Sequence, residues 1–164
     1  MKIKFERYIV YLVIILAIGY GWLVYRPQQQ EKTAEYITVQ RVIDGDTILL
    51  TDGRRVRYIG VDTPESGRMD TPIECYGKEA SEANKKLVEG KQVKLVKDIS
   101  DKDKYDRLLR FVYIDDIFVN EYLLKNGYAT VMSIAPDISK YPQFKLAQQE
   151  AKNNNLGLWN KCKP

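Results

Sequence analysis

In the stretch from residue 41 to residue 65, acidic side chains lie where short apolar segments end. This stretch reads RVIDGDTILLTDGRRVRYIGVDTPE, and four of its carboxylates lie within two residues of Gly or Pro, where strands stop and the chain turns: Asp44, Asp46, Asp62 and Glu65. Such turns can bring the carboxylates together at one rim of a small sheet. Gathered carboxylates repel one another unless a cation, a shared proton or an arginine such as Arg57 offsets their charge. The stretch therefore predicts a small β-sheet with a functional site at its rim.

Apolar segments and turn residues predict five strands and three helices. The strands are residues 36–43, 47–50, 56–59, 92–96 and 109–114, and the helices are residues 77–89, 119–126 and 142–153. Residues 60–75 contain Pro and Gly without periodicity and are expected to form a long loop, which in a compact domain is often functional. The charged residues 98–107 are expected to be a solvated loop. This order predicts an α+β, mainly β fold, a five-stranded Greek-key barrel of the oligonucleotide-binding type.

Three motifs in this order resemble those of the thermonuclease (staphylococcal nuclease) family. A DGDT turn at residues 44–47 precedes R-x-x-x-x-D-T-P-E at residues 57–65. DKYDR at residues 103–107 is similar to a DKYGR segment, and LGLW at residues 156–159 to the closing motif of the family. The likeness covers residues 36–161. It implies the same barrel and an endonuclease that hydrolyses single-stranded or frayed DNA and RNA with little sequence specificity, leaving 3′-phosphate ends.

The acidic pattern favours a hard cation. Asp46 and Asp62 offer oxygen ligands that suit Ca²⁺ or Mg²⁺, whereas zinc prefers His and Cys, and the chain has no His. The resemblance implies that Asp46 and Asp62 bind Ca²⁺ together with the backbone carbonyl of Thr63. Asp44, the first residue of a DG turn, is interpreted as a turn cap.

A chain without histidine must use another group as general base. A carboxylate, a tyrosine, a lysine or a thiol can serve, and Glu65 is the best placed because it follows Asp62 on the same loop. The resemblance assigns the base to Glu65; the alternative is an ordinary solvent-exposed loop acid.

Two arginines match the phosphate-binding positions of the family. Hydrolysis of a phosphodiester builds negative charge on the phosphate, which bidentate guanidinium groups can stabilise. The resemblance assigns this role to Arg57 and Arg107, although either could be a salt-bridge residue, as we expect of Arg54 and Arg110. Substrate contacts through Lys104 and Tyr105 are likewise implied by resemblance; an exposed Lys-Tyr pair is the alternative.

Two departures from the family pattern concern the substrate. Asp106 stands where the family has glycine and adds a negative charge beside Arg107. Ser133 and Ala135 replace two tyrosines that flank the base in the family. Since stacking on an aromatic ring contributes about 1 to 3 kcal/mol per base, we expect weaker nucleotide binding.

Net charge gives little guidance about partners. The chain carries 26 Lys and Arg against 22 Asp and Glu, a formal charge of +4, of which only +2 falls in residues 36–164. Bulk charge would therefore steer a polyanion weakly, and the contact must come from local arginines or a metal. A non-catalytic nucleic-acid- or protein-binding barrel is the competing function, and retention of the acids and arginines argues against it.

The N-terminus predicts a membrane anchor. Residues 8–25 contain no charge, and as a helix these 18 positions would span about 27 Å, close to a bilayer core of about 30 Å. Basic residues precede them, so residues 1–7 are expected in the cytoplasm and the domain at residues 36–164 outside, joined by a linker at residues 26–35. A cleaved signal peptide, with a secreted domain, is the alternative. We expect a monomer, and in an exported domain we expect Cys75 and Cys162 to form a disulfide.

Overall fold

The computed structural model describes residues 34–67 and 71–162. The strands are β1 (Glu35–Asp44), β2 (Thr47–Leu50), β3 (Arg55–Tyr58), β4 (Val61–Asp62), β5 (Gln92–Val96), β6 (Leu108–Ile114), β7 (Ile117–Phe118) and β8 (Thr130–Val131). The helices are α2 (Gly77–Val88), α3 (Val119–Lys125), α4 (Tyr141–Asn153) and α5 (Leu158–Lys161). The five strands and three helices predicted from the sequence are all present, each within one residue of its predicted bounds.

Five strands close into a barrel. Hydrogen bonding orders the main sheet β3-β2-β1-β5-β6-β7, and β3 also pairs with β6 in parallel, with Val56 opposite Leu108. Strand β1 makes closure possible because its first half pairs with β5 and its second half with β2, with register shifts after Val39 and Val42. Such bulges bend a strand and increase its twist. The predicted α+β barrel of the oligonucleotide-binding type is thus confirmed.

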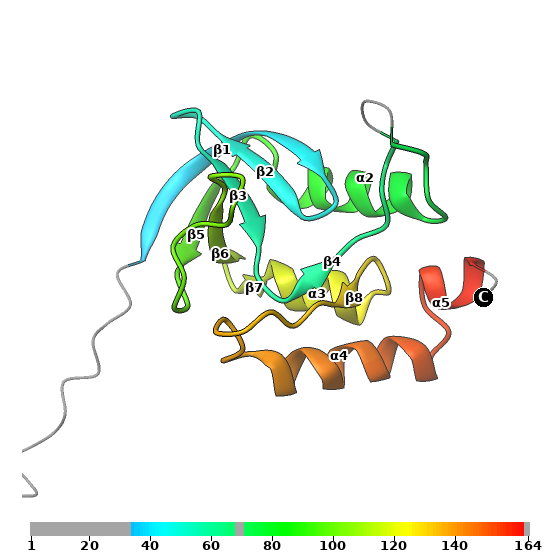
Figure 1. Cartoon of the computed structure of the whole chain (residues 1–164). Helices are drawn as coiled ribbons and strands as arrows, with labels where there is room; N and C mark the ends of the chain where they lie inside the picture. The colour runs from blue at the N-terminus through cyan, green and yellow to red at the C-terminus, as the bar shows by residue number, and fades with distance from the viewer. Residues whose placement is uncertain (1–33, 68–70, 163–164) are drawn as a thin grey trace, which may run out of the picture. The chain divides into compact units, whose positions relative to one another are not determined.

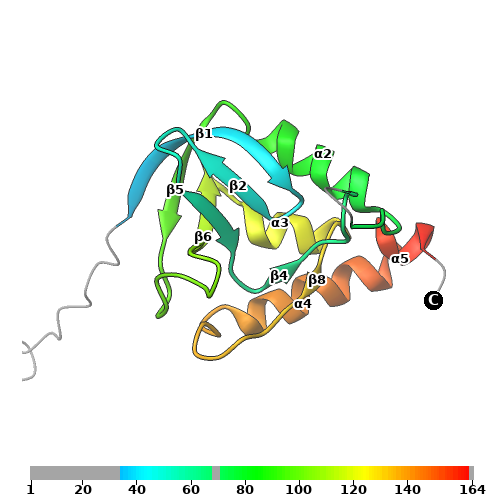
Figure 2. The same cartoon turned by 45° about the horizontal axis from the view of Figure 1, so that its top comes forward.

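The helices cover one side of the barrel. Helix α3 packs against α2, α4 and β6, and Figures 1 and 2 show α4 on the side of the molecule opposite β1. The barrel interior and the underside of the helices share one hydrophobic core, whose largest fully buried side chains include Tyr58, Phe111, Phe144, Ile48, Leu50 and Leu95.

Two buried asparagines connect the helices to the strand ends. Asn84 of α2 accepts a hydrogen bond from the Tyr58 hydroxyl (3.0 Å) and donates to the backbone carbonyl of Asp44 (3.3 Å). Asn120 of α3 accepts from the backbone N–H of Val112 (2.9 Å) and donates to the carbonyl of Ile59 (2.8 Å). A buried amide left without partners would cost more than such a bond contributes. These contacts therefore fix α2 and α3 to the backbone at the rim that carries the acids.

The segment predicted to be a long loop contains a strand. β4 pairs antiparallel with β8, with Asp62 opposite Thr130. Each of these strands has two residues, which is too short for an alternating pattern to reveal it. Their pairing sets the position of Asp62 on the rim.

A disulfide joins the loop after β4 to the end of the chain. The Cα atoms of Cys75 and Cys162 lie 5.8 Å apart, and the bond closes a loop with a sequence separation of 87. In the chain-entropy account, closing a loop of this length stabilises the fold by about 4.6 kcal/mol.

The predicted membrane segment and most of the predicted linker lie outside the described residues. Within residues 34–67 and 71–162, no helix is long and apolar enough to cross a membrane.

Candidate active site

The turn between β1 and β2 brings Asp46 against the segment that follows β4. Gly45 permits this approach, because a Cβ at that position would lie 2.5 Å from Thr63 Oγ1. Asp44 stabilises the turn itself: its Oδ1 accepts a hydrogen bond from the backbone N–H of Asp46 (3.1 Å). This is the capping role that the sequence predicts for Asp44.

Asp46 is a buried carboxylate with several donors. Only 5% of the residue is exposed, and its Oδ2 accepts hydrogen bonds from the backbone N–H of Thr63 (2.8 Å) and from Thr63 Oγ1 (3.0 Å). Burial raises the pKa of the Asp46 carboxyl above its usual value, and the charge of Arg57 opposes this shift. A buried carboxylate is stable in its charged form only with such partners.

Arg57 bridges the two predicted metal ligands. Its Nη1 lies 2.7 Å from Asp46 Oδ2, its Nη2 lies 2.8 Å from Asp62 Oδ1, and Nη1 also donates to the carbonyl of Val61 (2.8 Å). The guanidinium thus offsets the repulsion between the carboxylates. It also holds β3, β4 and the DGDT turn in fixed relation.

Six of the nine residues that line a small polar hollow are the predicted catalytic and metal-binding residues. The hollow measures about 60 Å³, roughly the volume of two water molecules in the liquid. Its lining residues are Asp44, Asp46, Thr47, Arg57, Asp62, Thr63, Pro64, Glu65 and Arg107. The structure therefore brings together all the predicted catalytic and metal-binding residues.

Two carboxylates of this hollow are ligands of the type that a hard divalent cation prefers. Asp46 and Asp62 present carboxylate oxygens on either side of Arg57, and oxygen is the ligand that Ca²⁺ and Mg²⁺ prefer. Across residues 34–67 and 71–162, three or more His, Cys, Asp or Glu side chains do not converge in an arrangement that could hold a metal ion.

Glu65 lines the same hollow but is exposed to solvent. Partial burial raises the pKa of its carboxyl, and the nearby charges of Asp44, Glu74 and Asp62 raise it further. Its backbone is held from outside the hollow, since its N–H donates to Glu74 Oε2 (3.0 Å). Glu65 thus combines access to water with a fixed backbone.

Arg107 is held by Asp103. Its Nε and Nη2 both lie 2.7 Å from Asp103 Oδ2, and its backbone N–H donates to Asp103 Oδ1 (3.0 Å). Asp106, the departure from the family glycine, has a positive φ of 61° and points its carboxylate to Lys102 Nζ at 2.7 Å. The ion pairs thus join Asp106 to Lys102 and Arg107 to Asp103.

A larger groove adjoins the hollow. It has a volume of about 460 Å³, and both Arg57 and Arg107 line it as well as the hollow. Lys104 Nζ lies 4.9 Å from the centre of the Tyr105 ring, and both residues line the groove; Tyr105 as a whole is 58% exposed. The predicted substrate-binding residues therefore lie next to the predicted catalytic ones.

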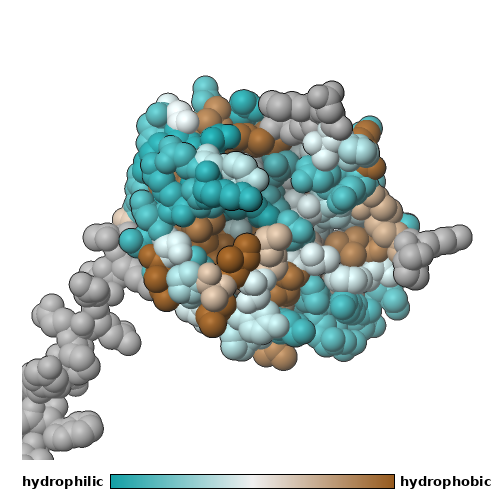
Figure 3. All heavy atoms as spheres, viewed as in Figure 1, coloured by the Kyte–Doolittle hydropathy of each residue, from teal (hydrophilic) through white to brown (hydrophobic). Residues whose placement is uncertain are grey.

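Aliphatic side chains form one wall of this groove. Met132, Ile134 and Ala135 line it, whereas Ser133 lines a separate small hollow. Figure 3 shows hydrophobic side chains gathered on this face, over the β5–β6 loop and the segment that leads to α4. The two segments are joined by Asp137, whose Oδ1 accepts hydrogen bonds from the backbone N–H of Ile99 and of Ser100.

Sequence reasoning did not single out two of the acids that support the site. Asp103 belongs to the charged loop and to the DKYDR motif but is given no role of its own there, although an acid four residues before an arginine in a short loop can pair with it. Glu74 lies at the end of the long loop, and nothing in the sequence separates it from other loop acids. Arg54 and Arg110 are salt-bridge residues as predicted, paired with Glu35 and Asp52 and with Asp101.

Known proteins match most of this chain. A family model described as staphylococcal nuclease homologue matches residues 55–161. Endonuclease YncB of Bacillus subtilis (strain 168) is 42% identical over 138 residues, which are 81% of this chain and 65% of YncB. The SPbeta prophage-derived endonuclease YokF of the same organism is 42% identical over 130 residues, 76% of this chain and 44% of YokF. The thermonuclease of Staphylococcus intermedius is 38% identical over 161 residues, 91% of this chain and 96% of that protein.

The fold and the site together define a class of protein: a small β-barrel whose rim carries acids and arginines and forms a candidate site for a polyanion. The range matched by the family model includes Arg57, Asp62, Glu65 and Arg107 and the closing helices. The chain belongs to the staphylococcal nuclease family. It spans less than two thirds of the length of the two Bacillus relatives.

Proposed function

We propose that this protein is a Ca²⁺-dependent endonuclease that hydrolyses DNA and RNA with little sequence specificity and leaves 3′-phosphate ends. The observation that carries the proposal is the position of Arg57 and Arg107, which line both the acidic hollow and the groove. A phosphate held between these arginines would have carboxylates on one side and a groove for its nucleoside on the other. The names of the similar proteins, endonuclease and thermonuclease, support the same reaction.

Six residues of the hollow have a role in this proposal. Asp46, Asp62 and the carbonyl of Thr63 would hold Ca²⁺, which when bound supplies positive charge to the phosphate. Glu65 accepts a proton from the attacking water, because its exposed carboxylate lines the hollow and is not paired with either arginine in an ion pair. Arg57 and Arg107 donate to the phosphate oxygens as negative charge builds on them. Arg107 can do so from a fixed position, because Asp103 pairs with its Nε and Nη2.

The groove indicates how a substrate is bound. An exposed Tyr105 ring, the Lys104 ammonium and the aliphatic wall form a surface for one nucleoside and its phosphate. A base inside a duplex cannot enter such a groove, so single-stranded or frayed DNA and RNA are the proposed substrates.

Digestion of single-stranded DNA and of RNA by the purified domain tests this function. We expect cleavage with Ca²⁺ and none after chelation, with activity restored when Ca²⁺ is added back. Replacing Asp46 by Asn should abolish the restoration of activity by Ca²⁺. The same replacement at Asp116, which lines neither the hollow nor the groove, should not. Full activity in chelator would overturn the metal assignment, and absence of cleavage under every condition would favour a binding module.

We also propose that residues 8–25 anchor the protein in the cell membrane as a single span, with the nuclease domain outside. The uncharged segment preceded by basic residues supports this proposal. Protease added to intact cells should then remove the domain, while a cytoplasmic marker protein stays whole. Survival of the domain until the cells are broken open would show the opposite orientation, and its appearance in the medium would show cleavage of a signal peptide.

A further inference from the structure

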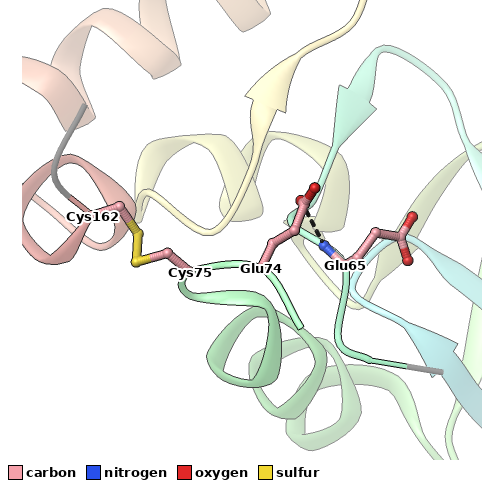
Figure 4. The surroundings of a disulfide bond; sticks show 4 residues. All are labelled: Glu65, Glu74, Cys75 and Cys162. Carbon is pink, nitrogen blue, oxygen red and sulfur yellow. Dashed lines mark hydrogen bonds between the residues drawn. A yellow bond between two sulfur atoms is a disulfide. The ribbon is translucent and has the colours of Figure 1, made fainter. Parts of the chain in front are cut away.

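Glu74 joins the two ends of the loop that begins at Glu65. The backbone N–H of Glu65 donates to Glu74 Oε2 (3.0 Å), and the backbone N–H of Glu74 donates to the carbonyl of Glu65 (2.9 Å). Next to this pair, Ser66 and Ile73 form an antiparallel bridge. Figure 4 shows Glu74 between Glu65 and the disulfide, with its carboxylate turned to the Glu65 backbone. One side chain therefore fixes the backbone of the proposed base.

Helix α2 packs closely against the backbone of Glu65. A Cβ at Gly77, the first residue of α2, would lie 2.1 Å from the carbonyl oxygen of Glu65. The Gly77 N–H donates to the carbonyl of Glu74 (3.1 Å). Since only a glycine allows this approach, the backbone of Glu65 is enclosed between α2 and Glu74.

The disulfide ties Glu74 to the C-terminal helix. Cys75, the next residue, is bonded to Cys162 at the end of α5. Helix α5 is itself fixed to the turn after α3, because the N–H of Leu158 donates to the carbonyl of Gly127 (2.9 Å). A continuous series of contacts thus runs from α3 through α5 and the disulfide to Glu74 and the backbone of Glu65.

The negative charge of Glu74 indicates that this residue has a functional role. A further carboxylate beside Glu65, whose pKa the charges of Asp44 and Asp62 already raise, adds repulsion. A neutral residue at position 74 would avoid that cost. A carboxylate offers a strong acceptor for the Glu65 N–H in return, because a hydrogen bond to an ionised group is stronger than one between neutral groups.

We propose that Glu74 is a positioning residue that holds the backbone of Glu65 in place for catalysis, and that the Cys75–Cys162 disulfide holds Glu74. The proposal rests on the proposed function, in which Glu65 is the general base. A base must lie within hydrogen-bond reach of the water that it deprotonates, and a small misplacement lowers the rate. Glu74 itself touches no substrate.

Hydrogen exchange of the Glu65 amide tests the contact without any activity measurement. Glu74→Ala should accelerate this exchange, and Glu74→Gln should restore part of the protection because the amide oxygen still accepts. Glu89→Ala is the matched control: Glu89 Oε2 accepts from the backbone N–H of Val42 (2.8 Å), the same kind of bond away from the hollow. Unchanged exchange at Glu65 in Glu74→Ala would overturn the proposal.

Kinetics then test the link to catalysis. Well below the unfolding temperature, Glu74→Ala should lower kcat about 3- to 10-fold, the effect of one lost hydrogen bond, with KM little changed and with Glu74→Gln in between. Glu89→Ala should leave kcat unchanged even if it lowers Tm. An equal fall of kcat in both variants would mean that Glu74 acts only through stability, contrary to the proposal.

A double-mutant cycle separates this proposal from the proposed function. If Glu74 acts through Glu65, Glu74→Ala should cost nothing further in a Glu65→Gln background. A full additional loss there would overturn the positioning role. If Glu65→Gln alone has no effect on kcat, the assignment of the base fails instead, while the exchange experiment still decides whether Glu74 holds the Glu65 backbone.

The role of the disulfide in holding Glu74 is tested with a double variant that carries both Cys75→Ser and Cys162→Ser. The double variant should show faster Glu65 amide exchange and a lower kcat, in the same direction as Glu74→Ala. Exchange and kcat that match the parent protein would remove the disulfide from the proposal.

Discussion

Replacement of Glu65 by glutamine is expected to lower kcat by about two to four orders of magnitude, the usual contribution of a positioned general base. Glutamine keeps the size of the side chain but has no site of useful basicity. KM should change little, because the carboxylate acts on the attacking water and makes no contact with the bound nucleotide in this scheme. Single-turnover cleavage of a short single-stranded DNA is the measurement.

The control for Glu65→Gln is Glu82→Gln. Glu82 is an exposed acid of α2 that lines neither the hollow nor the groove. This variant should cleave at the parent rate. A Glu65→Gln enzyme that retains full kcat would show that another group, or bulk water alone, removes the proton.

Replacement of Arg57 by lysine is expected to lower kcat about 10²- to 10³-fold, comparable to the loss of one donor that stabilises an anionic transition state. An ammonium is a compact charge and cannot reproduce the planar fork by which Arg57 spans Asp46 and Asp62. The variant should also be less stable, because buried Asp46 keeps only a poorer partner. Cleavage rates at saturating DNA and the midpoint of thermal unfolding measure the two effects.

Arg54→Lys is the matched control for Arg57. Arg54 also bridges two carboxylates, Glu35 and Asp52, but these groups are about two fifths exposed and lie outside the hollow. We expect an unchanged kcat and a small effect on stability, as for other exposed ion pairs. Equal losses of kcat in both variants would mean that Arg57 acts by stabilising the fold and has no part in the chemistry.

The alternation of apolar segments and turns determined the strands and helices of this protein. Residues 47–50 and 92–96 are strands with the predicted bounds, because local hydrophobic pattern and turn chemistry agree there with the final fold. The DG turn required Asp44 as a cap, and that requirement is local too.

Barrel closure and the support of the site depended on contacts between residues far apart in the chain. The parallel pairing of β3 with β6 joins Val56 to Leu108, and no local pattern specifies such a partner. The same holds for the β4–β8 pair, whose strands are too short to carry a period.

The sequence by itself determined which chemical groups are available at the rim: carboxylates at turns, arginines in and after strands, and no histidine. Only the tertiary structure decided how they are engaged. Arg57 lies between Asp46 and Asp62, Asp103 holds Arg107, and Glu74 holds the backbone of Glu65. The physical reason is that residue type fixes charge and hydrogen-bonding capacity, whereas partners are chosen by distance, which only the folded chain sets.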